Sequence, residues 1–142
     1  MQVHSYLFFE GRCEEAMAFY EKTLGAKRGM LMRYGESPES CPEGMIPPGS
    51  ENKIMHAEFT IGDTMVMASD GMVSGKPKFD GFSLSVDFSD VAAAEKAFHA
   101  LADGGEVGMK LDETFYAKIF GMVKDRFGMN WMVIVPKEMP KV

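Results

Sequence analysis

The chain has 142 residues, of which 46% are hydrophobic, 25% charged and 11% aromatic, fractions typical of one ordinary globular domain. Its 15 basic and 21 acidic residues leave a net charge of −6 without any Lys/Arg-rich run, so we expect no nucleic-acid partner. The longest apolar run, 131–136, is far shorter than the ~20 residues of a membrane-spanning helix, so we expect no membrane partner.

The amino terminus lacks the basic and apolar regions of an export signal, which favours a cytoplasmic protein. Cys13 and Cys41 fit no metal-binding spacing and are expected to be reduced thiols. Methionine is abundant, at 14 residues. A methionine-rich interior suits either an adaptable apolar cavity or simply a methionine-rich core.

The first half begins as strand, helix, strand. Apolar residues at helical spacing precede Gly25, and a Gly62-Asp63 turn joins two short apolar runs into a hairpin. The elements expected in order are a strand over 3–9, a helix over 14–24, a strand over 26–34, a proline-rich loop over 35–52, and hairpin strands over 54–61 and 64–69.

The second half repeats this order. Ser89-Asp90 is a typical helix N-cap, and Gly104-Gly105 ends the helix. The expected elements are a strand over 81–88, a helix over 91–102, and strands over 106–111, 115–124 and 130–135.

An offset of 79 positions aligns the two halves at identical residues, which indicates an internal duplication of a βαβββ unit. The coinciding pairs are Phe9 and Phe88, Ala18 and Ala97, Phe19 and Phe98, Gly25 and Gly104, Gly29 and Gly108, and Met30 and Met109. We therefore predict an α+β fold in a single domain over 1–142. Its parts are a first module over 1–70, a linker over 71–79 and a second module over 80–142.

Several motifs resemble the vicinal oxygen chelate superfamily of glyoxalases, bleomycin-resistance proteins and dioxygenases, and within it the PhnB-like (3-demethylubiquinone methyltransferase-like) branch. The motifs are Tyr6-Leu7-Phe8-Phe9, Glu14-Glu15-Ala16, Phe19-Tyr20, His56-Ala57-Glu58-Phe59, Met67-Ala68-Ser69-Asp70, Glu113-Thr114-Phe115-Tyr116 and Gly121-x-Val123-x-Asp125-x-Phe127-Gly128-x-x-Trp131. The resemblance implies two βαβββ modules whose mixed, curved sheets form a concave cleft, and a homodimer. Nothing in the sequence resembles a glycine-rich loop for a nucleotide or S-adenosylmethionine.

Alignment with metal-using members of that superfamily places their ligand positions at Ser5, Thr60, Gly81 or Phe82, and Met132. None of these residues offers an imidazole or carboxylate, whereas a divalent metal site needs three or four such ligands. We therefore expect no metal and no other cofactor. A metal held by His56 and Glu58 is the alternative.

Seven residues are candidates for ligand binding: Ser5, His56, Glu58, Thr60, Phe115, Met122 and Met132. Strand alternation predicts that His56, Glu58 and Thr60 share one face. It predicts equally that Ser5, Leu7 and Phe9 face the concave side, and that His4, Tyr6 and Phe8 face the helix. Trp131, of opposite parity to Met132, is expected in the core.

Three functions fit this pattern. The first is a protein that binds a small, partly apolar molecule in a metal-free cleft. The second is a glyoxalase-type lyase or isomerase that uses His56 and Glu58, with or without a divalent metal. The third is a structural dimeric module with a vestigial cleft. Whether the protein is an enzyme stays open at this point, and Cys13 is expected to be a packing residue rather than a nucleophile.

Overall fold

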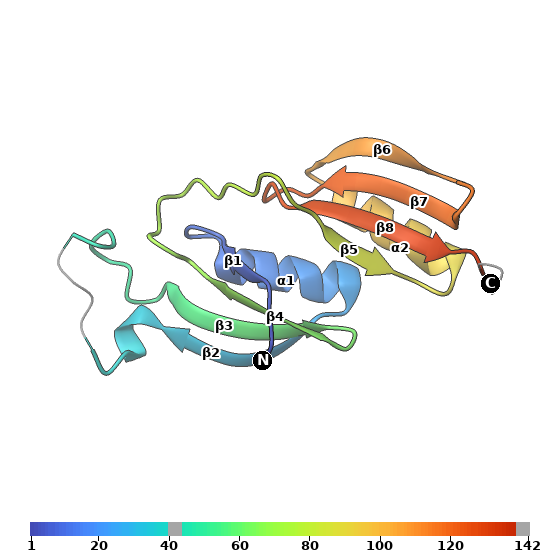
Figure 1. Ribbon diagram of the computed structural model, residues 1–142. Helices are drawn as coiled ribbons and strands as arrows, with labels where there is room; N and C mark the ends of the chain where they lie inside the picture. Colours follow the sequence, from blue (N-terminus) through green and yellow to red (C-terminus); the bar gives the residue numbers. More distant parts are fainter. Residues whose placement is uncertain (40–43, 139–142) are drawn as a thin grey trace. The chain divides into compact units, whose positions relative to one another are not determined.

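A computed structural model describes residues 1–39 and 44–138 of the chain, and shows two modules of the same construction (Figure 1). The chain divides into two compact units, Met1–Lys78 and Phe79–Val142. Each unit holds one helix and one four-stranded mixed sheet, so the fold is α+β.

The first module contains β1 (Tyr6–Phe8), α1 (Cys13–Leu24), β2 (Lys27–Arg33), a 3₁₀ turn η1 (Tyr34–Glu36), β3 (Ile54–Ile61) and β4 (Thr64–Ser69). The strands lie in the order β1-β4-β3-β2. β1 runs parallel to β4, and the other neighbours are antiparallel.

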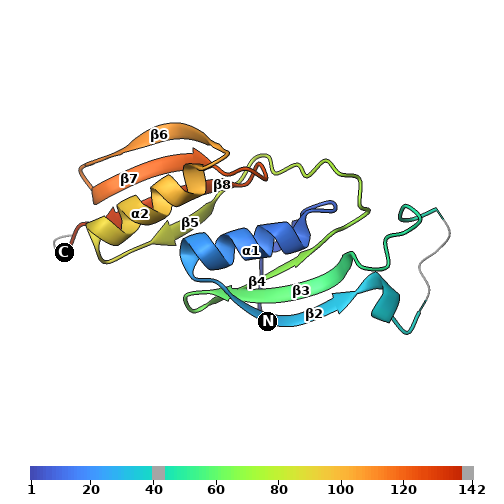
Figure 2. The ribbon, with the colours of Figure 1, turned by 180° about the vertical axis from the view of Figure 1, so that it is seen from behind.

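Helix α1 covers one face of this sheet and leaves the other face open (Figures 1 and 2). Its buried Tyr20 ring lies 6.1 Å from the ring of Phe9 and 6.2 Å from that of Phe59. Gly25, with φ of 68°, ends the helix in the left-handed conformation that glycine adopts without strain. The face against α1 is therefore the core of the module.

The second module contains β5 (Leu84–Asp87), α2 (Val91–Ala102), β6 (Glu106–Asp112), β7 (Ala117–Lys124) and β8 (Asn130–Pro136). Its strand order, β5-β8-β7-β6, repeats that of the first module. Asp90 caps α2 by accepting the backbone N–H of Ala93. Trp131 is 2% exposed, which confirms that it belongs to the core.

Each expected helix and strand is present, although several strands are shorter than predicted. The first strand covers Tyr6–Phe8 instead of 3–9, and the fifth covers Leu84–Asp87 instead of 81–88. Helix α2 has the predicted bounds. The loop expected over 35–52 lies partly outside the described residues.

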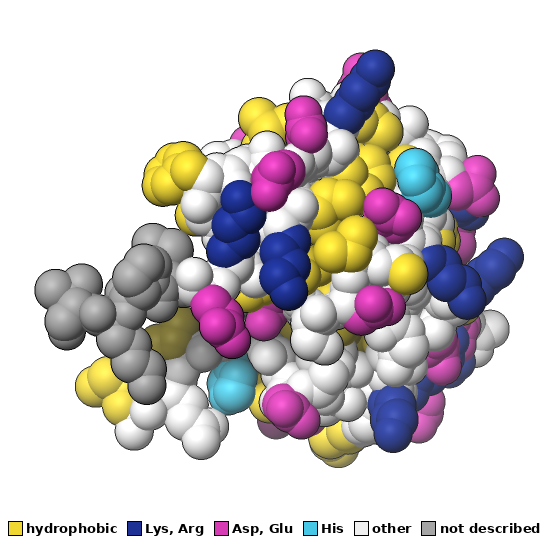
Figure 3. Space-filling view, turned by 90° about the vertical axis from the view of Figure 1, so that its right-hand side faces the viewer, with side chains coloured by type: hydrophobic (Ala, Val, Ile, Leu, Met, Phe, Trp, Pro, Cys, Tyr) yellow, Lys and Arg dark blue, Asp and Glu magenta, His cyan; other side chains and the backbone are white. Residues whose placement is uncertain are grey.

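Charges of both signs are dispersed over the face seen in Figure 3, with hydrophobic side chains between them. Neither sign dominates that face. Within the part of the chain that the structure describes, neither helix is long and apolar enough to cross a membrane.

Candidate functional site

A β-bulge in β3 lies beside His56, which faces the open side of the first sheet together with Glu58. Met32 pairs with His56 whereas Arg33 pairs with Ile54, so Met55 is the extra residue. The burial pattern of β3 shows the same irregularity, because Met55 and His56 are both half-buried between Ile54 and Ala57, which are buried.

His56 lies between a phenol and a carboxylate. The hydroxyl of Tyr6 is 2.9 Å from its Nδ1, and Oε2 of Glu58 is 3.7 Å from its Nε2. The side chains of His56 and Glu58 are 25% and 27% exposed, so neither is fully hydrated. The three side chains form a line with the imidazole of His56 in the middle.

Burial raises the pKa of Tyr6, although a hydrogen bond with Ser69 opposes the shift. The phenol is therefore protonated at neutral pH. Its ring also lies 5.0 Å from that of Phe8 and 5.5 Å from the imidazole of His56. Tyr6 thus acts at this site through a neutral hydroxyl group and an aromatic face.

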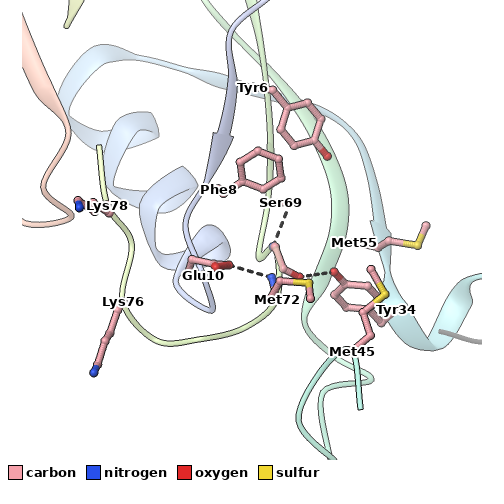
Figure 4. Close-up of a pocket in the computed structure, with 11 residues that line it drawn as sticks. Tyr6, Phe8, Glu10, Tyr34, Met45, Met55, Ser69, Met72, Lys76 and Lys78 are labelled. Atoms are coloured by element: carbon pink, nitrogen blue, oxygen red, sulfur yellow. Dashed lines mark hydrogen bonds between the residues drawn. The ribbon is translucent and has the colours of Figure 1, made fainter. Parts of the chain in front are cut away.

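Tyr6 also lines a pocket of about 480 Å³ in the first module (Figure 4). This volume lies within the range of small-molecule sites. Three methionines, Met45, Met55 and Met72, line this pocket. In Figure 4 they lie with Tyr34 on the side opposite Lys76 and Lys78. The lining residues are Tyr6, Phe8, Glu10, Tyr34, Met45, Met55, Ser69, Gly71, Met72, Lys76 and Lys78.

Hydrogen bonds hold the segment after β4 against the wall of this pocket. Glu10 accepts the backbone N–H of Met72 at 2.8 Å, and Oγ of Ser69 accepts that of Gly71 at 3.0 Å. The hydroxyl of Tyr34 donates to the carbonyl of Gly71. Gly71 has a φ of 56°, a left-handed backbone conformation that favours glycine.

The predicted parity of β1 is wrong. Leu7 and Phe9 are 2% and 0% exposed and belong to the core beneath α1, whereas Tyr6 contacts His56 on the open face. Ser5 precedes β1 and is exposed, and alternation with Leu7 and Phe9 does not place it on the open face. Its carbonyl accepts the backbone N–H of Met67.

Thr60 lies on β3 with the alternation of Glu58, and pairs with Lys27 and Met65 near the hairpin turn. In the second module, Met122 and Met132 pair across β7 and β8 and are half-buried. Phe115 is 86% exposed. The assignment of all seven candidates to one ligand site stays a prediction.

Asp70, which follows β4, is a structural residue. It is 1% exposed, and its carboxylate accepts the backbone N–H groups of Gly11, Cys13 and Ile54. Burial, and next the charge of Asp70, raise the pKa of the Cys13 thiol to about 12. Cys13 is therefore a protonated packing residue, as expected. Cys41 lies outside the described residues.

The metal that the superfamily resemblance implies does not fit this chain. The aligned positions carry hydroxyl, thioether or apolar groups in place of imidazole and carboxylate ligands. Among the described residues, no group of three His, Cys, Asp or Glu side chains is placed to hold a metal ion.

Sequence reasoning missed Tyr6 and the pocket methionines. One signal for Tyr6 was available, because it is the only tyrosine among the residues of β1, and a phenol hydroxyl needs a polar partner that an apolar core does not offer. Met45 and Met72 come from loops, and no periodicity in the sequence places them at a pocket.

Comparison with known proteins identifies relatives along the whole chain. A family described as 3-demethylubiquinone-9 3-methyltransferase matches residues 1–134. Protein YjdN of Escherichia coli strain K12 is 40% identical over 147 positions, which cover 99% of each chain.

Two solved structures are also similar to this chain over nearly its whole length. Protein PA1353 from Pseudomonas aeruginosa is 38% identical with a TM-score of 0.82, over 97% of this chain and 99% of that one. A putative 3-demethylubiquinone-9 3-methyltransferase, the PhnB protein from Bacillus cereus, is 29% identical with a TM-score of 0.77, over 95% and 99%.

The wider superfamily shares the fold. A glyoxylase/bleomycin resistance protein/dioxygenase domain from Frankia sp. EAN1pec has a TM-score of 0.65 at 14% identity, over 96% of this chain and 98% of that one.

Proposed function

Because the chain belongs to the 3-demethylubiquinone-9 3-methyltransferase (PhnB-like) family, with the glyoxalase/bleomycin-resistance fold, we propose that it binds a small, partly apolar molecule without a metal ion. The observation that carries this proposal is the pocket of about 480 Å³ on the first module. Its methionine and aromatic walls suit an apolar body, and the hydroxyl of Tyr6 suits a polar substituent.

The proposal extends to the oligomeric state. The superfamily resemblance implies a homodimer, and the edge strand β6 exposes Val107 and Met109, which supports an apolar contact with a second copy. Light scattering after size-exclusion chromatography tests this part of the proposal, and a monomer at micromolar concentration would contradict it.

The first experiment is a thermal-shift screen of small apolar and hydroxylated compounds, repeated with two matched variants. Met72 lines the pocket and is 50% exposed, whereas Met30 lies on β2 outside it and is 52% exposed. A compound that stabilises the wild-type protein should not stabilise Met72→Glu, because the new carboxylate occupies the apolar wall. The same compound should still stabilise Met30→Glu.

If a compound no longer raised the melting temperature of Met30→Glu but still raised that of Met72→Glu, its binding site would lie outside this pocket. A screen in which nothing raises the melting temperature would favour the third alternative, a structural dimeric module with a vestigial cleft.

The second candidate function is a glyoxalase-type lyase or isomerase, and the contacts around His56 favour it specifically. In this function His56 would act as general base on a proton that it takes through the hydroxyl of Tyr6, with Glu58 orienting the imidazole. His56→Ala should then abolish turnover while binding persists. Elemental analysis of untagged protein purified without chelator adds a second test, because near-stoichiometric metal lost in His56→Ala would overturn the metal-free proposal.

A further inference from the structure

We infer that the pocket of the first module selects aromatic molecules carrying a hydrogen-bond donor, that is, hydroxylated aromatics, because the oxygen of Tyr6 faces the ligand as an acceptor. This inference rests on the proposed function, whose binding site it shares. It follows from the order in which Glu58, His56 and Tyr6 are connected.

Glu58 sets the tautomer of His56. Nε2 lies 3.7 Å from the carboxylate oxygen of Glu58. An N–H dipole pointing at this oxygen is attracted, whereas a nitrogen lone pair in the same place is repelled. Both side chains are largely shielded from water, which strengthens the preference. The neutral imidazole of His56 therefore carries its proton on Nε2.

The tautomer of His56 determines the direction of its hydrogen bond with Tyr6. With the proton on Nε2, Nδ1 of His56 is an acceptor only, so the hydrogen bond of 2.9 Å between Nδ1 and the hydroxyl is donated by Tyr6. The phenol proton is thereby engaged. The phenol oxygen keeps its lone pairs and can accept a hydrogen bond. A ligand in the pocket meets an acceptor at this position, not a donor.

Glu10 and Tyr34 are further polar side chains that line the pocket. Glu10, a carboxylate, contributes only acceptor atoms, and the hydroxyl proton of Tyr34 is donated to the carbonyl of Gly71. The lysines of the pocket lie on its other side in Figure 4. Around Tyr6 the pocket therefore rewards a ligand that donates a hydrogen bond.

The apolar wall of the pocket suits an aromatic ring as the body of the ligand. Met45, Met55 and Met72 line the wall with their thioethers, and Phe8 presents its ring beside Tyr6. Thioether sulfur and ring edges both make favourable contacts with aromatic groups. An aromatic ring bearing a hydroxyl group combines the two requirements.

The test compares 4-ethylphenol with its methyl ether, 4-ethylanisole, by NMR titration of the full-length protein. The wild-type protein should bind the phenol about three- to tenfold more tightly, the effect expected of one hydrogen bond. Tyr6→Phe should reduce this ratio to about one while 4-ethylanisole still binds, because the ring is retained. Tyr116→Phe, in the second module, should leave the ratio unchanged.

A second measurement reports the tautomer directly. The ¹⁵N shifts of the His56 ring, assigned with a His56→Asn variant, should show the proton on Nε2 in the wild-type protein. Glu58→Ala should weaken that preference and reduce the ratio of affinities. A proton found on Nδ1 in the wild-type protein would overturn the inference.

The remaining outcomes separate the inference from the proposed function. Equal binding of the two compounds overturns the inference and leaves the proposed function intact. Binding of neither, when the wider screen finds another ligand, also overturns only the inference. A screen without any ligand overturns both.

Discussion

Oδ1 of Asp70 accepts the backbone N–H of Cys13 at 2.8 Å, and so connects the end of β4 to the first turn of α1. The same carboxylate accepts the N–H groups of Gly11 and Ile54, at 3.1 and 2.6 Å. One buried side chain therefore satisfies donors from three segments of the first module. The carboxylate of Asp70 therefore stabilises the fold of the first module and does not serve as a substrate ligand.

Asp70→Ala should lower the free energy of unfolding by about 3 kcal/mol, because it leaves buried N–H groups without an acceptor. Urea unfolding followed by circular dichroism measures the change. Asp87, exposed on β5, provides the control, and Asp87→Ala should change stability by less than about 0.5 kcal/mol. Equal effects of the two substitutions would show that the network around Asp70 contributes nothing.

The thiol of Cys13 should be unreactive in the folded protein. Burial raises its pKa to about 12, so the reactive thiolate is scarce at pH 8. In a Cys41→Ser variant, Ellman's reagent should release no chromophore from the native protein and one equivalent after urea unfolding. Rapid native reaction would contradict both the burial and the packing role of Cys13.

The same pKa shift makes stability fall at high pH. The unfolded thiol ionises near its ordinary value of 9.0, whereas the folded thiol ionises only near 12. Between these values the unfolded chain has lost a proton that the folded chain keeps, so stability decreases as the pH rises. Cys13→Ala should remove this part of the alkaline slope.

Glu14 joins α1 to β2 through two arginines. Its Oε2 lies 2.7 Å from Arg33 and 3.4 Å from Arg28, and the hydrogen bond from Arg33 is the main reason that its pKa lies below the usual value. The Glu14 side chain is 49% exposed, so solvent screens much of this attraction. Glu14→Gln should therefore cost only about 0.3–1 kcal/mol at pH 7 and low salt.

The sign of the pH dependence follows from the lowered pKa. The contribution of Glu14 is present above the usual glutamate pKa and is lost as the pH falls through the lowered value. The difference between wild-type and Glu14→Gln should thus vanish in acid, and also shrink in 1 M salt. Glu95→Gln, on the exposed side of α2, is the control.

The helices and strands can be predicted from the sequence, but which side chains of β1 face the core cannot. Helix α2 is predictable because Asp90 caps it and Gly104 follows it, both local signals. In β1, both alternating sets are apolar enough to be buried, so periodicity alone does not choose between Leu7 and Tyr6. The choice depends on the long-range contact between Phe9 and Tyr20.

The bulge in β3 limits prediction at the candidate site for a related reason. Strict alternation puts Met55 and His56 on opposite faces, whereas the extra residue in β3 allows both to remain half-buried beside the pocket wall. The shift depends on how Met32 and Arg33 pair with β3. That register is a property of two strands, and it leaves no mark within the β3 sequence itself.

Gly121 in β7 provides a test of close packing in the second module. A Cβ at this position would lie 2.8 Å from Leu111, 2.9 Å from the ring of Phe98 on α2 and 3.1 Å from the carbonyl oxygen of Met109. The first two contacts involve side chains that can shift, but the third is with backbone. Helix α2 and β6 approach β7 as closely as they do because residue 121 lacks a side chain.

Gly121→Ala should therefore destabilise the protein by about 1–3 kcal/mol, the usual cost of overpacking a core. Gly108 on β6 is the matched control, because a Cβ there would meet its nearest atom, the carbonyl oxygen of Met122, at an ordinary 3.7 Å. Gly108→Ala should change stability by less than about 0.5 kcal/mol. The fluorescence of Trp131, the only tryptophan, reports unfolding of this module in urea. If Gly121→Ala proved as stable as Gly108→Ala, the packing of α2 against β7 would have to be looser than the structure describes.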